Sequence, residues 1–451
     1  MKITIIGAGE LGQLLAERLC AARHDVVVVD SSRNGFDYIR NKLDVMVMQG
    51  DATNIALMKR ACEPGTELLL AVSGDQASNM TACLLARQLG VKKTICRIYS
   101  ENSFSEEDGV TPALFGIDHV VSSARECARR VCGVLRHPAV LDDIDFFNRQ
   151  AAMVAIRIPQ DSPLTGKKLE ELPDKELLSS IRFAALVRRR RLRTPNGKTS
   201  LEAGDCVYVA GSRDAVERFL NSLEQSDAPT SRRVVIAGAT LLGEYVAKEA
   251  LSQGMEVTLV TRDEEQGNDF IERVSQQVRV IIGDCTDKDV LVEAGVPGCE
   301  VFVGAEDDDE IGILGCIVAN RLGAQKVVAV THKPEYMDIV PEMEVIDCGF
   351  NATVVAVNTV FRQMGAQFPC VDSRLHGFQA YLAEFAVQPK SRLNGRQVKD
   401  AGLPSAAVLA MVIRGNAVLA PSGGMTLQVG DVVVAIVTSE SEELLKPFFI
   451  S

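Results

Sequence analysis

The sequence predicts an α/β fold with two doubly wound parallel-sheet domains, each followed by a small β-rich α+β domain. The first observation is a repeat, since the opening MKITIIGAGELG returns later in the chain as RVVIAGATLLG. The second is that short β-branched runs alternate with helical patterns in both copies. The third is that strands such as VVVV, and ELLLAV after its first residue, are continuously apolar instead of alternating, which is typical of a parallel sheet covered on both faces. These observations together indicate a tandem duplication.

The elements of the first copy follow from its apolar spacing. The pattern predicts a strand over 2–6, a helix from about residue 11 to 22, and a strand over 26–30. The helix has apolar residues at helical spacing, which form one buried face: Leu11, Leu14, Leu15 and Leu19. Farther along, QGDATNIALMKRAC matches IGDCTDKDVLVEAG. Both copies are therefore expected to share one topology.

A different unit follows each copy. MVAIRIPQDSPLTGKKLEEL matches YLAEFAVQPKSRLNGRQVKDAG, with Gly166 and Gly395 in register. Short alternating strands separated by turn signals predict a small α+β domain here. The chain is thus divided into four predicted domains: a first nucleotide-binding domain 1–140, a first small domain 141–228, a second nucleotide-binding domain 232–366 and a second small domain 371–451.

The composition limits the range of functions. The net charge is −12, aromatic residues make up 5% and tryptophan is absent. The chain therefore lacks the basic stripe and the stacking platforms that nucleic-acid binding uses, and no nucleic acid is expected as a partner. The twelve cysteines include no C-x-x-C pair, so no metal site is predicted. Cys83 and Cys316 are expected to pack as small hydrophobes on apolar helix faces.

The first glycine turn predicts a bound adenine nucleotide. Gly7 allows the tight turn, Gly9 lets a pyrophosphate approach the backbone, and Gly12 lets the helix pack closely. Asp30 closes the second strand and would accept hydrogen bonds from the adenosine ribose. The alternative is a turn that only packs. The predicted ligand-binding residues of this part are Gly7, Ala8, Gly9, Glu10, Leu11, Gly12 and Asp30.

Further ligand-binding residues are predicted where the third, fourth and fifth strands end, since doubly wound sheets bind ligands at that edge. They are Asp51, Ala52, Thr53, Ser73, Gly74 and Arg97. Arg97 would bind a phosphate through several N–H donors. The GDAT segment has two possible roles. Besides binding a ligand, it can be structural, with Asp51 or Thr53 capping the next helix.

The second copy differs at these same positions. Thr240 replaces Gly9 and would crowd a pyrophosphate, Thr261 replaces Asp30, and Val330 replaces Arg97. Two interpretations stay open: an empty site, or a site for a smaller ligand such as a mononucleotide bound by Arg262. The residues of this possible second nucleotide site are Gly238, Ala239, Thr240, Gly243, Thr261, Arg262 and Asp284.

Two charged runs each allow two interpretations. The acidic run 306–310, EDDDE, is interpreted as favourable charge at a helix N-terminus, with a cation site as the alternative. The arginine run 188–191 is interpreted as a solvated hairpin tip, because Arg189 and Arg190 align with the turn residues Gly415 and Asn416. Its alternative is contact with an anionic surface or an acidic partner.

The sequence contains no recognisable catalytic set. G-x-S-x-G, H-E-x-x-H and a Walker lysine motif are all missing, and the five histidines are dispersed. We therefore predict no catalytic residues and no enzyme. An NAD-dependent oxidoreductase is the alternative that the intact first glycine motif leaves open, and a scaffold with vestigial nucleotide sites is another.

The organisation resembles the TrkA family, the regulatory subunits of Trk potassium uptake. The resemblance rests on the duplicated order of domains, on MKITIIGAGELG, Asp30 and GDAT, and on the SNMTACLLAR helix, and it covers essentially the whole chain. It implies two RCK units, for regulator of potassium conductance. It also implies NAD(H) at the first site, and ATP or ADP as possible modulators.

The resemblance further implies partners and a location. It predicts a homo-oligomeric ring, expected as a tetramer, beneath a potassium-translocating membrane subunit of Trk type. The chain is then cytoplasmic and peripheral on the cytoplasmic side of the inner (cell) membrane. Two segments are predicted as helices that leave the nucleotide domains and could pair subunits: HVVSSARECARRVCGVLRH and NATVVAVNTVFRQM.

Overall fold

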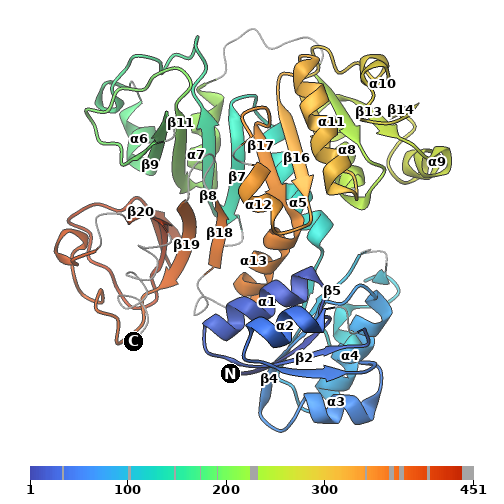
Figure 1. Cartoon of the computed structure of the whole chain (residues 1–451). Coiled ribbons are helices and arrows are strands. Elements are labelled where there is room, and N and C mark those ends of the chain that lie inside the picture. The colour runs from blue at the N-terminus through green and yellow to red at the C-terminus, as the bar shows by residue number, and fades with distance from the viewer. Residues whose placement is uncertain are drawn as a thin grey trace. The chain divides into compact units, whose positions relative to one another are not determined.

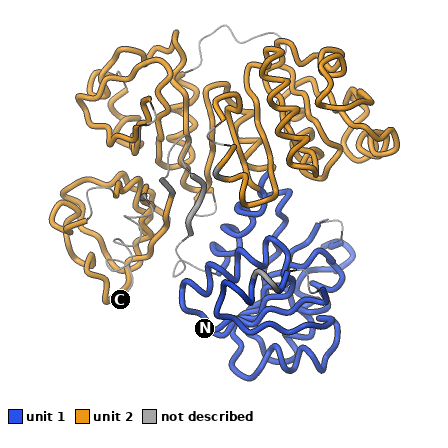
Figure 2. Tube along the Cα trace, viewed as in Figure 1, with its two compact units in different colours: residues 1–127, 352–364 blue, residues 128–351, 365–451 orange. Residues whose placement is uncertain are grey.

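The structure is a computed structural model of the chain, and it divides into two compact units (Figure 2). Unit 1 comprises 1–127 and 352–364, and unit 2 comprises 128–351 and 365–451. The described residues are 1–32, 35–99, 103–146, 149–172, 174–189, 191–223, 232–340, 343–364, 370–374, 380–403 and 407–438. Among them, no helix has the length and apolar character needed to cross a membrane.

Unit 1 is built on a six-stranded parallel sheet in the order β3-β2-β1-β4-β5-β6. The strands are β1 (Lys2–Ile6), β2 (Asp25–Asp30), β3 (Met46–Gln49), β4 (Thr66–Ala71), β5 (Lys93–Arg97) and β6 (His119–Val121). The strand order reverses between β1 and β4, so the carboxyl ends of these two strands border the crevice in which such sheets bind ligands. The predicted doubly wound fold is confirmed.

Helices cover both faces of this sheet (Figure 1). They are α1 (Glu10–Ala21), α2 (Phe36–Lys42), α3 (Ile55–Ala61), α4 (Gln76–Gln88) and the 3-10 helix η2 (Pro112–Phe115). Helix α1 buries Leu11, Leu15 and Leu19 against the sheet, while Leu14 is half-buried. Cys83 of α4 is buried in the core as predicted.

A helix from the second copy completes unit 1. Helix α13 (Ala352–Met364) follows the second parallel sheet in sequence but packs against α1 and β6. Arg18 of α1 donates to the side-chain oxygen of Asn358 at 2.8 Å and lies over the ring of Phe361 at 6.0 Å. The ammonium of Lys93 donates to the carbonyl of Gln363. The predicted helix is therefore confirmed, and within this chain it joins the two copies.

Unit 2 contains the second parallel sheet, in the equivalent order β14-β13-β12-β15-β16-β17. Its strands are β12 (Arg233–Ala237), β13 (Glu256–Thr261), β14 (Arg279–Ile282), β15 (Val301–Gly304), β16 (Val327–Thr331) and β17 (Cys348–Asn351). Its helices are α8 (Leu241–Ser252), α9 (Glu264–Arg273), α10 (Lys288–Glu293), α11 (Asp309–Arg321) and α12 (Tyr336–Ile339). Cys316 of α11 is fully buried, as predicted.

The helix that leaves the first copy is shorter than predicted. Helix α5 spans Ser123–Leu135, and 119–121 form β6 instead of the start of the helix. The β-branched pair Val120 and Val121 joins the sheet edge by pairing with β5. Likewise Asn351 ends β17 and the second exit helix begins at Ala352.

The two small domains are five-stranded antiparallel sheets in the equivalent orders β10-β9-β11-β8-β7 and β21-β20-β22-β19-β18. The first contains β7 (Val140–Phe146), β8 (Ala151–Arg157), β9 (Ile181–Arg188), β10 (Arg191–Arg193), β11 (Cys206–Ser212), η3 (Leu169–Glu171), α6 (Lys175–Ser180) and α7 (Arg213–Asn221). The second contains β18 (Cys370–Arg374), β19 (Ala380–Ala386), β20 (Val408–Arg414), β21 (Ala417–Leu419), β22 (Val432–Thr438) and η5 (Val398–Asp400). The predicted α+β class is confirmed.

The hairpin predicted at the arginine run is present, but Arg188 is not part of its solvated tip. Arg188 ends β9 and its guanidinium donates to Asp205 at 2.7 and 2.6 Å. Arg414 and Asp431 make the same pair in the second small domain, at 2.8 Å for both contacts. Both aspartates are buried, and a buried carboxylate is costly without a partner. Arg188 therefore has a structural role. Arg190 lies outside the described residues.

Candidate functional site

The glycine turn after β1 is shaped by close backbone approaches. Gly7 has φ +107°, and a methyl group placed on it would lie 2.7 Å from the Cα of Ser73 at the end of β4. A methyl group on Gly12 would lie 1.9 Å from the carbonyl oxygen of Gly7. Only glycine fits these two positions, so β4 and helix α1 both pack directly on the turn.

Gly9 differs because nothing packs on it. It is the N-cap residue of α1 with φ −70° and ψ −177°, which any residue adopts. A methyl group placed on Gly9 would meet no atom within 4 Å among the described residues. No described side chain caps the helix at this point. The N-terminus of a 12-residue helix therefore borders open space, which favours a negatively charged group such as a pyrophosphate.

Asp30 lies beside the turn at the end of β2. One carboxylate oxygen accepts from the backbone N–H of Ala8 at 2.6 Å, and the other accepts from the N–H of Ser32 at 2.8 Å. These bonds hold the carboxylate on the β2 side of the turn, where a ribose would lie. The sequence did not identify Gly35, where a methyl group would lie 2.1 Å from the carbonyl oxygen of Ala8. This glycine lets the segment before α2 approach the turn.

The GDAT segment forms a turn of its own after β3. Asp51 accepts from the backbone N–H of Thr53 at 2.8 Å, and this bond lowers the pKa of Asp51. The N-cap of α3 is Asn54, which accepts from Ala56 N–H at 2.9 Å. The capping role considered for Asp51 or Thr53 is therefore wrong, because the helix begins one residue later. Ala52 is buried in the core.

Asn79 ties the ends of β4 and β5 together. Its side-chain oxygen accepts from the backbone N–H of Ser73 at 2.9 Å and from the Ser73 hydroxyl at 2.7 Å. Its amide group donates to the carbonyls of Ser73 at 3.0 Å and Arg97 at 3.2 Å. Asn79 is 0% exposed, so its own position is fixed. Asn79 was not among the residues predicted from the sequence, although an asparagine on an otherwise apolar helix face was a signal.

Arg97 ends β5 and lies next to Tyr99. Its guanidinium carbon is 4.8 Å from the centroid of the Tyr99 ring. The side-chain oxygen of Gln76 accepts from the backbone N–H of Tyr99 at 2.8 Å. The structure thus places the predicted residues at the carboxyl ends of five neighbouring strands, β3-β2-β1-β4-β5, and adds Asn79, Gln76 and Tyr99 to them.

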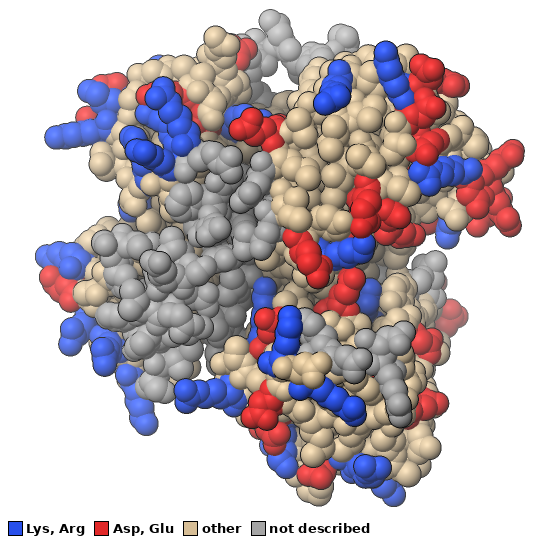
Figure 3. Space-filling model, in the orientation of Figure 1, with Lys and Arg blue, Asp and Glu red and all other residues tan. Residues whose placement is uncertain are grey.

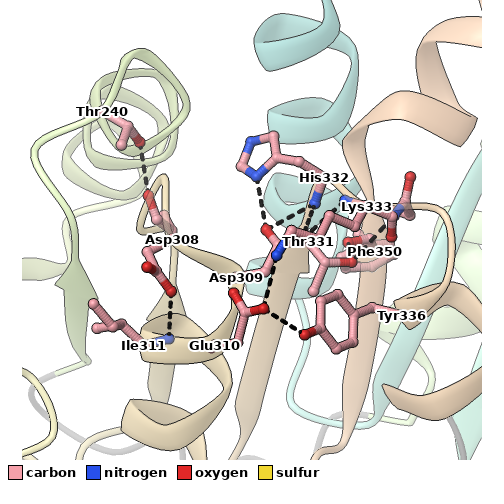
Figure 4. A network of polar contacts seen from close by, with 12 residues as sticks. Thr240, Asp308, Asp309, Glu310, Ile311, Thr331, His332, Lys333, Tyr336 and Phe350 are labelled. Carbon is pink, nitrogen blue, oxygen red and sulfur yellow. Dashed lines mark hydrogen bonds and ion pairs between the residues drawn. The ribbon is translucent and has the colours of Figure 1, made fainter. Parts of the chain in front are cut away.

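In the second copy, a side chain closes the glycine turn (Figure 4). Gly238 keeps the turn with φ +111°. Thr240 is the N-cap of α8, and its hydroxyl accepts from the backbone N–H of Gly243 at 3.2 Å. The same hydroxyl donates to the carbonyl of Ala305 at 2.9 Å. The helix amide that a phosphate would use is therefore already bonded.

Residues that follow β13 and β14 also bond to one another. Thr261, in the position of Asp30, is buried. Arg262 donates to Asp284 at 2.8 Å, which raises the pKa of Arg262. Asp284 also accepts from the backbone N–H and the hydroxyl of Thr286, and these bonds contribute most to its lowered pKa. Arg262 thus has a carboxylate partner without any ligand, and Ala239 offers no polar side chain.

The acidic run begins helix α11, as its first interpretation predicted. Asp308 is the N-cap and accepts from the backbone N–H of Ile311 at 3.0 Å (Figure 4). Asp309 is buried and accepts from the backbone N–H groups of His332 and Lys333, both at 2.9 Å. The Nδ1 atom of His332 is 2.9 Å from the same carboxylate.

Glu310 completes this network with Lys333 and Tyr336. It accepts from the Lys333 ammonium at 2.7 Å and from the Tyr336 hydroxyl at 2.8 Å (Figure 4). The bond to Lys333 is the main reason why the pKa of Glu310 falls to about 2. The acidic side chains are thus used in capping and in pairing. Within the described part of the chain, no group of three or more His, Cys, Asp or Glu residues is placed to hold a metal ion.

The two copies therefore differ in what they can bind. Among the described residues, the first presents a helix N-terminus without a side-chain cap, open space at Gly9 and a carboxylate beside the turn. This arrangement fits a dinucleotide with its pyrophosphate at the helix and its adenosine ribose at Asp30. The face drawn in Figure 3 shows basic and acidic side chains interspersed over the described residues, with no continuous basic stripe.

Two family models match the chain. The TrkA-N domain model matches 3–123 and 234–351, and the TrkA-C domain model matches 153–224 and 382–450. The matched segments together cover more than half of the chain. They alternate in the order of the duplicated domains.

Relatives of known name match over the full length. The "Trk system potassium uptake protein TrkA" of Vibrio alginolyticus is 27% identical over 459 residues, covering 99% of this chain and 99% of the relative. The protein of the same name from Halomonas elongata is 28% identical, covering 97% of this chain and 96% of the relative. The homolog from Archaeoglobus fulgidus is 26% identical, with 100% of both chains covered.

Two solved structures share the fold. The crystal structure of the GsuK RCK domain matches with a TM-score of 0.62 and 18% identity, covering 99% of this chain and 94% of that one. The GsuK channel bound to NAD matches with a TM-score of 0.60 and 18% identity, covering 99% of this chain and 78% of that one. At this identity the likeness concerns the fold.

Proposed function

The chain belongs to the TrkA family, and from this membership we propose that it is a nucleotide-binding regulatory subunit of potassium uptake. It binds NAD(H) in its first parallel-sheet domain and acts on a separate potassium-translocating membrane subunit of Trk type. The relatives that match over their whole length are named as potassium uptake proteins, and a structure with the same fold holds NAD.

The observation that carries the proposal is the difference between the two glycine turns. In the part of the chain that the structure describes, nothing packs on Gly9 and no side chain caps its helix, whereas Thr240 caps its helix with its own hydroxyl. Because the two backbones are otherwise equivalent, the difference concerns ligand binding and not folding. We therefore assign NAD(H) to the first copy and propose that the second copy binds no dinucleotide.

Different residues of the first site bind different parts of the nucleotide. The amides after Gly9 bind the pyrophosphate and Asp30 binds the adenosine ribose, while Ser73, Gly74 and Arg97 border the other half of the dinucleotide. ADP and ATP share the adenosine half, so they compete for the same turn. In this proposal the bound nucleotide shifts a conformational equilibrium through its binding energy. It undergoes no reaction, so the protein is not an enzyme.

Regulation follows from differential affinity. A nucleotide shifts a conformational equilibrium only by the difference in its affinity for the two states. We propose that the chain forms a homo-oligomeric ring, with a tetramer as the expected size. The ring lies at the cytoplasmic side of the inner membrane, where a change in its conformation alters the conformation of the translocating subunit.

Co-purification tests this function. The tagged full-length chain is expressed with a Trk-type translocating subunit, and the membrane fraction is purified with and without NADH. We expect the two proteins to purify together, and potassium uptake in cells to depend on an intact Asp30. Failure to co-purify under both conditions, together with substrate-dependent oxidation of NADH by the isolated chain, would support an oxidoreductase instead.

A further inference from the structure

Tyr99 is an exposed aromatic residue at the edge of the first nucleotide site. It lies two residues beyond the end of β5 and is 39% exposed. Its backbone is held by Gln76 at 2.8 Å, and the Arg97 guanidinium lies over its ring at 4.8 Å. A methyl group placed on Gly74 would come 4.0 Å from the Tyr99 hydroxyl. The backbone of Tyr99 is thus held by a hydrogen bond and its ring contacts Arg97, while part of the ring surface stays exposed.

The position of Tyr99 is opposite to that of Asp30. Asp30 is on β2, on one side of the reversal between β1 and β4, and Tyr99 follows β5 on the other side. In doubly wound sheets the two mononucleotide halves of a dinucleotide lie on opposite sides of this point. A nucleotide with its adenosine at Asp30 therefore extends its second half toward Ser73, Gly74 and Tyr99.

We propose that Tyr99 stacks on the nicotinamide ring and so makes the first site selective for NAD(H) over nucleotides that lack this ring. The inference rests on the proposed function, and it concerns one residue of the same site. A tyrosine ring offers a large flat surface with little conformational freedom to lose. Arg97 holds that ring from one side by a cation–π contact.

The second copy gives a natural comparison. His332 occupies the position of Tyr99, and its Nδ1 atom is 2.9 Å from the buried Asp309 carboxylate. Val330 occupies the position of Arg97. The pair of Arg97 and Tyr99 thus occurs in the copy with the open glycine turn. In the copy with the closed turn, His332 instead contacts Asp309 of its own domain.

Calorimetry with three ligands tests the inference on the full-length chain. The ligands are NADH, ADP-ribose, which lacks only the nicotinamide, and ADP. Since stacking of a ring on an aromatic side chain contributes about 1–3 kcal/mol, Tyr99→Ala is expected to weaken NADH binding by roughly 5- to 150-fold. ADP-ribose and ADP are expected to keep their affinities. Tyr99→Phe retains the ring and is expected to retain NADH affinity.

Two controls keep the test decisive. His332→Ala changes the matched position of the second copy and is expected to leave NADH affinity unchanged. Unchanged ADP affinity in Tyr99→Ala shows that the site is folded. If Tyr99→Ala weakens NADH and ADP-ribose equally, or weakens neither, the inference is wrong. If Asp30→Ala also leaves NADH affinity unchanged, the site assignment itself is wrong, so the two failures can be distinguished.

Discussion

Lys93 and Lys326 occupy equivalent positions in the two copies, and the ammonium of each donates to backbone carbonyls near the end of the exit helix of the other copy. Lys93 starts β5 and bonds to Gln363 of α13. Lys326 directly precedes β16 and bonds to three carbonyls at 3.0, 3.0 and 2.9 Å, those of Val134, His137 and Val140. A positive charge is favourable at a helix C-terminus, so this lysine pair anchors the exchanged helices.

Lys326→Met is expected to destabilise the protein. Lys326 is only 4% exposed, and methionine fills a similar volume but leaves three buried carbonyls without this donor. We expect the free energy of unfolding to fall by about 2–4 kcal/mol. Urea unfolding followed by circular dichroism measures the change. Lys93→Met, at a half-buried position, should cost less, and an equal or larger cost would contradict this ranking.

The same lysine predicts a pH dependence. Burial lowers the pKa of Lys326 to about 8, whereas an exposed lysine has a pKa of about 10.4. Between these values the unfolded chain holds a proton that the folded chain has released, so the contribution of Lys326 to stability rises with pH. The difference in unfolding free energy between the unchanged chain and Lys326→Met should therefore grow from pH 8 to 10. A constant difference would show that the pKa is not lowered.

Asp205→Ala is expected to destabilise the first small domain. Asp205 is 1% exposed and accepts from Arg188 at 2.7 and 2.6 Å. The change removes the charged hydrogen bonds from Arg188 and the bond from the backbone N–H of Glu202, while Arg188 keeps the Glu202 carboxylate as a partner. We therefore expect a loss of about 1.5–3 kcal/mol. Thermal unfolding measures this loss. Arg191→Ala, at an exposed position of the same hairpin, should change stability by less than about 0.5 kcal/mol.

The parallel sheets and the small antiparallel domains were predictable because apolar periodicity and repetition record them directly. β6 was missed because a short β-branched segment next to a long amphipathic helix pattern is ambiguous in sequence. The placement of α13 against α1 could not be predicted either. The two copies offer equivalent surfaces to each exit helix, and a single sequence does not say which surface a helix covers.

The site was predictable to the extent that topology fixes it. Strand order brings five strand ends to one edge, so the position of Asp30, Ser73 and Arg97 at that edge was predictable from the sequence. Asn79 and Gly35 were missed, because their roles depend on hydrogen bonds and contacts that exist only after packing. The hairpin at the arginine run was predicted correctly, but the ion pair of Arg188 with Asp205 was missed for the same reason, since it joins the end of β9 to the residue before β11.

Asp30→Ala is expected to weaken NADH binding while the fold is retained. The loss of hydrogen bonds between a carboxylate and ribose hydroxyls costs about 1.5–3 kcal/mol, or roughly 10- to 150-fold in affinity. Calorimetry on the isolated chain measures it. Thr261→Ala changes the equivalent position of the second copy and should leave NADH affinity as it was. Equal losses in the two variants would place the nucleotide in both copies.

Exchange of the two turn residues tests the difference between the copies most directly. Gly9→Thr is expected to abolish NADH binding without unfolding, because Thr240 has nearly the same backbone angles, φ −93° and ψ 164°, as Gly9 with φ −70° and ψ −177°. The new hydroxyl would cap α1 as Thr240 caps α8, and would fill the space that a pyrophosphate needs.

The reverse exchange, Thr240→Gly, should not create a second NADH site. Arg262 would still be paired with Asp284, and Thr261 would still stand where a ribose needs a carboxylate. We therefore expect one NADH per chain in the unchanged protein and in Thr240→Gly, and none in Gly9→Thr, as measured by calorimetric stoichiometry. A stoichiometry of two NADH molecules per unchanged chain would contradict this expectation. It would mean that a phosphate displaces the Thr240 hydroxyl and breaks its 3.2 Å bond with the Gly243 N–H.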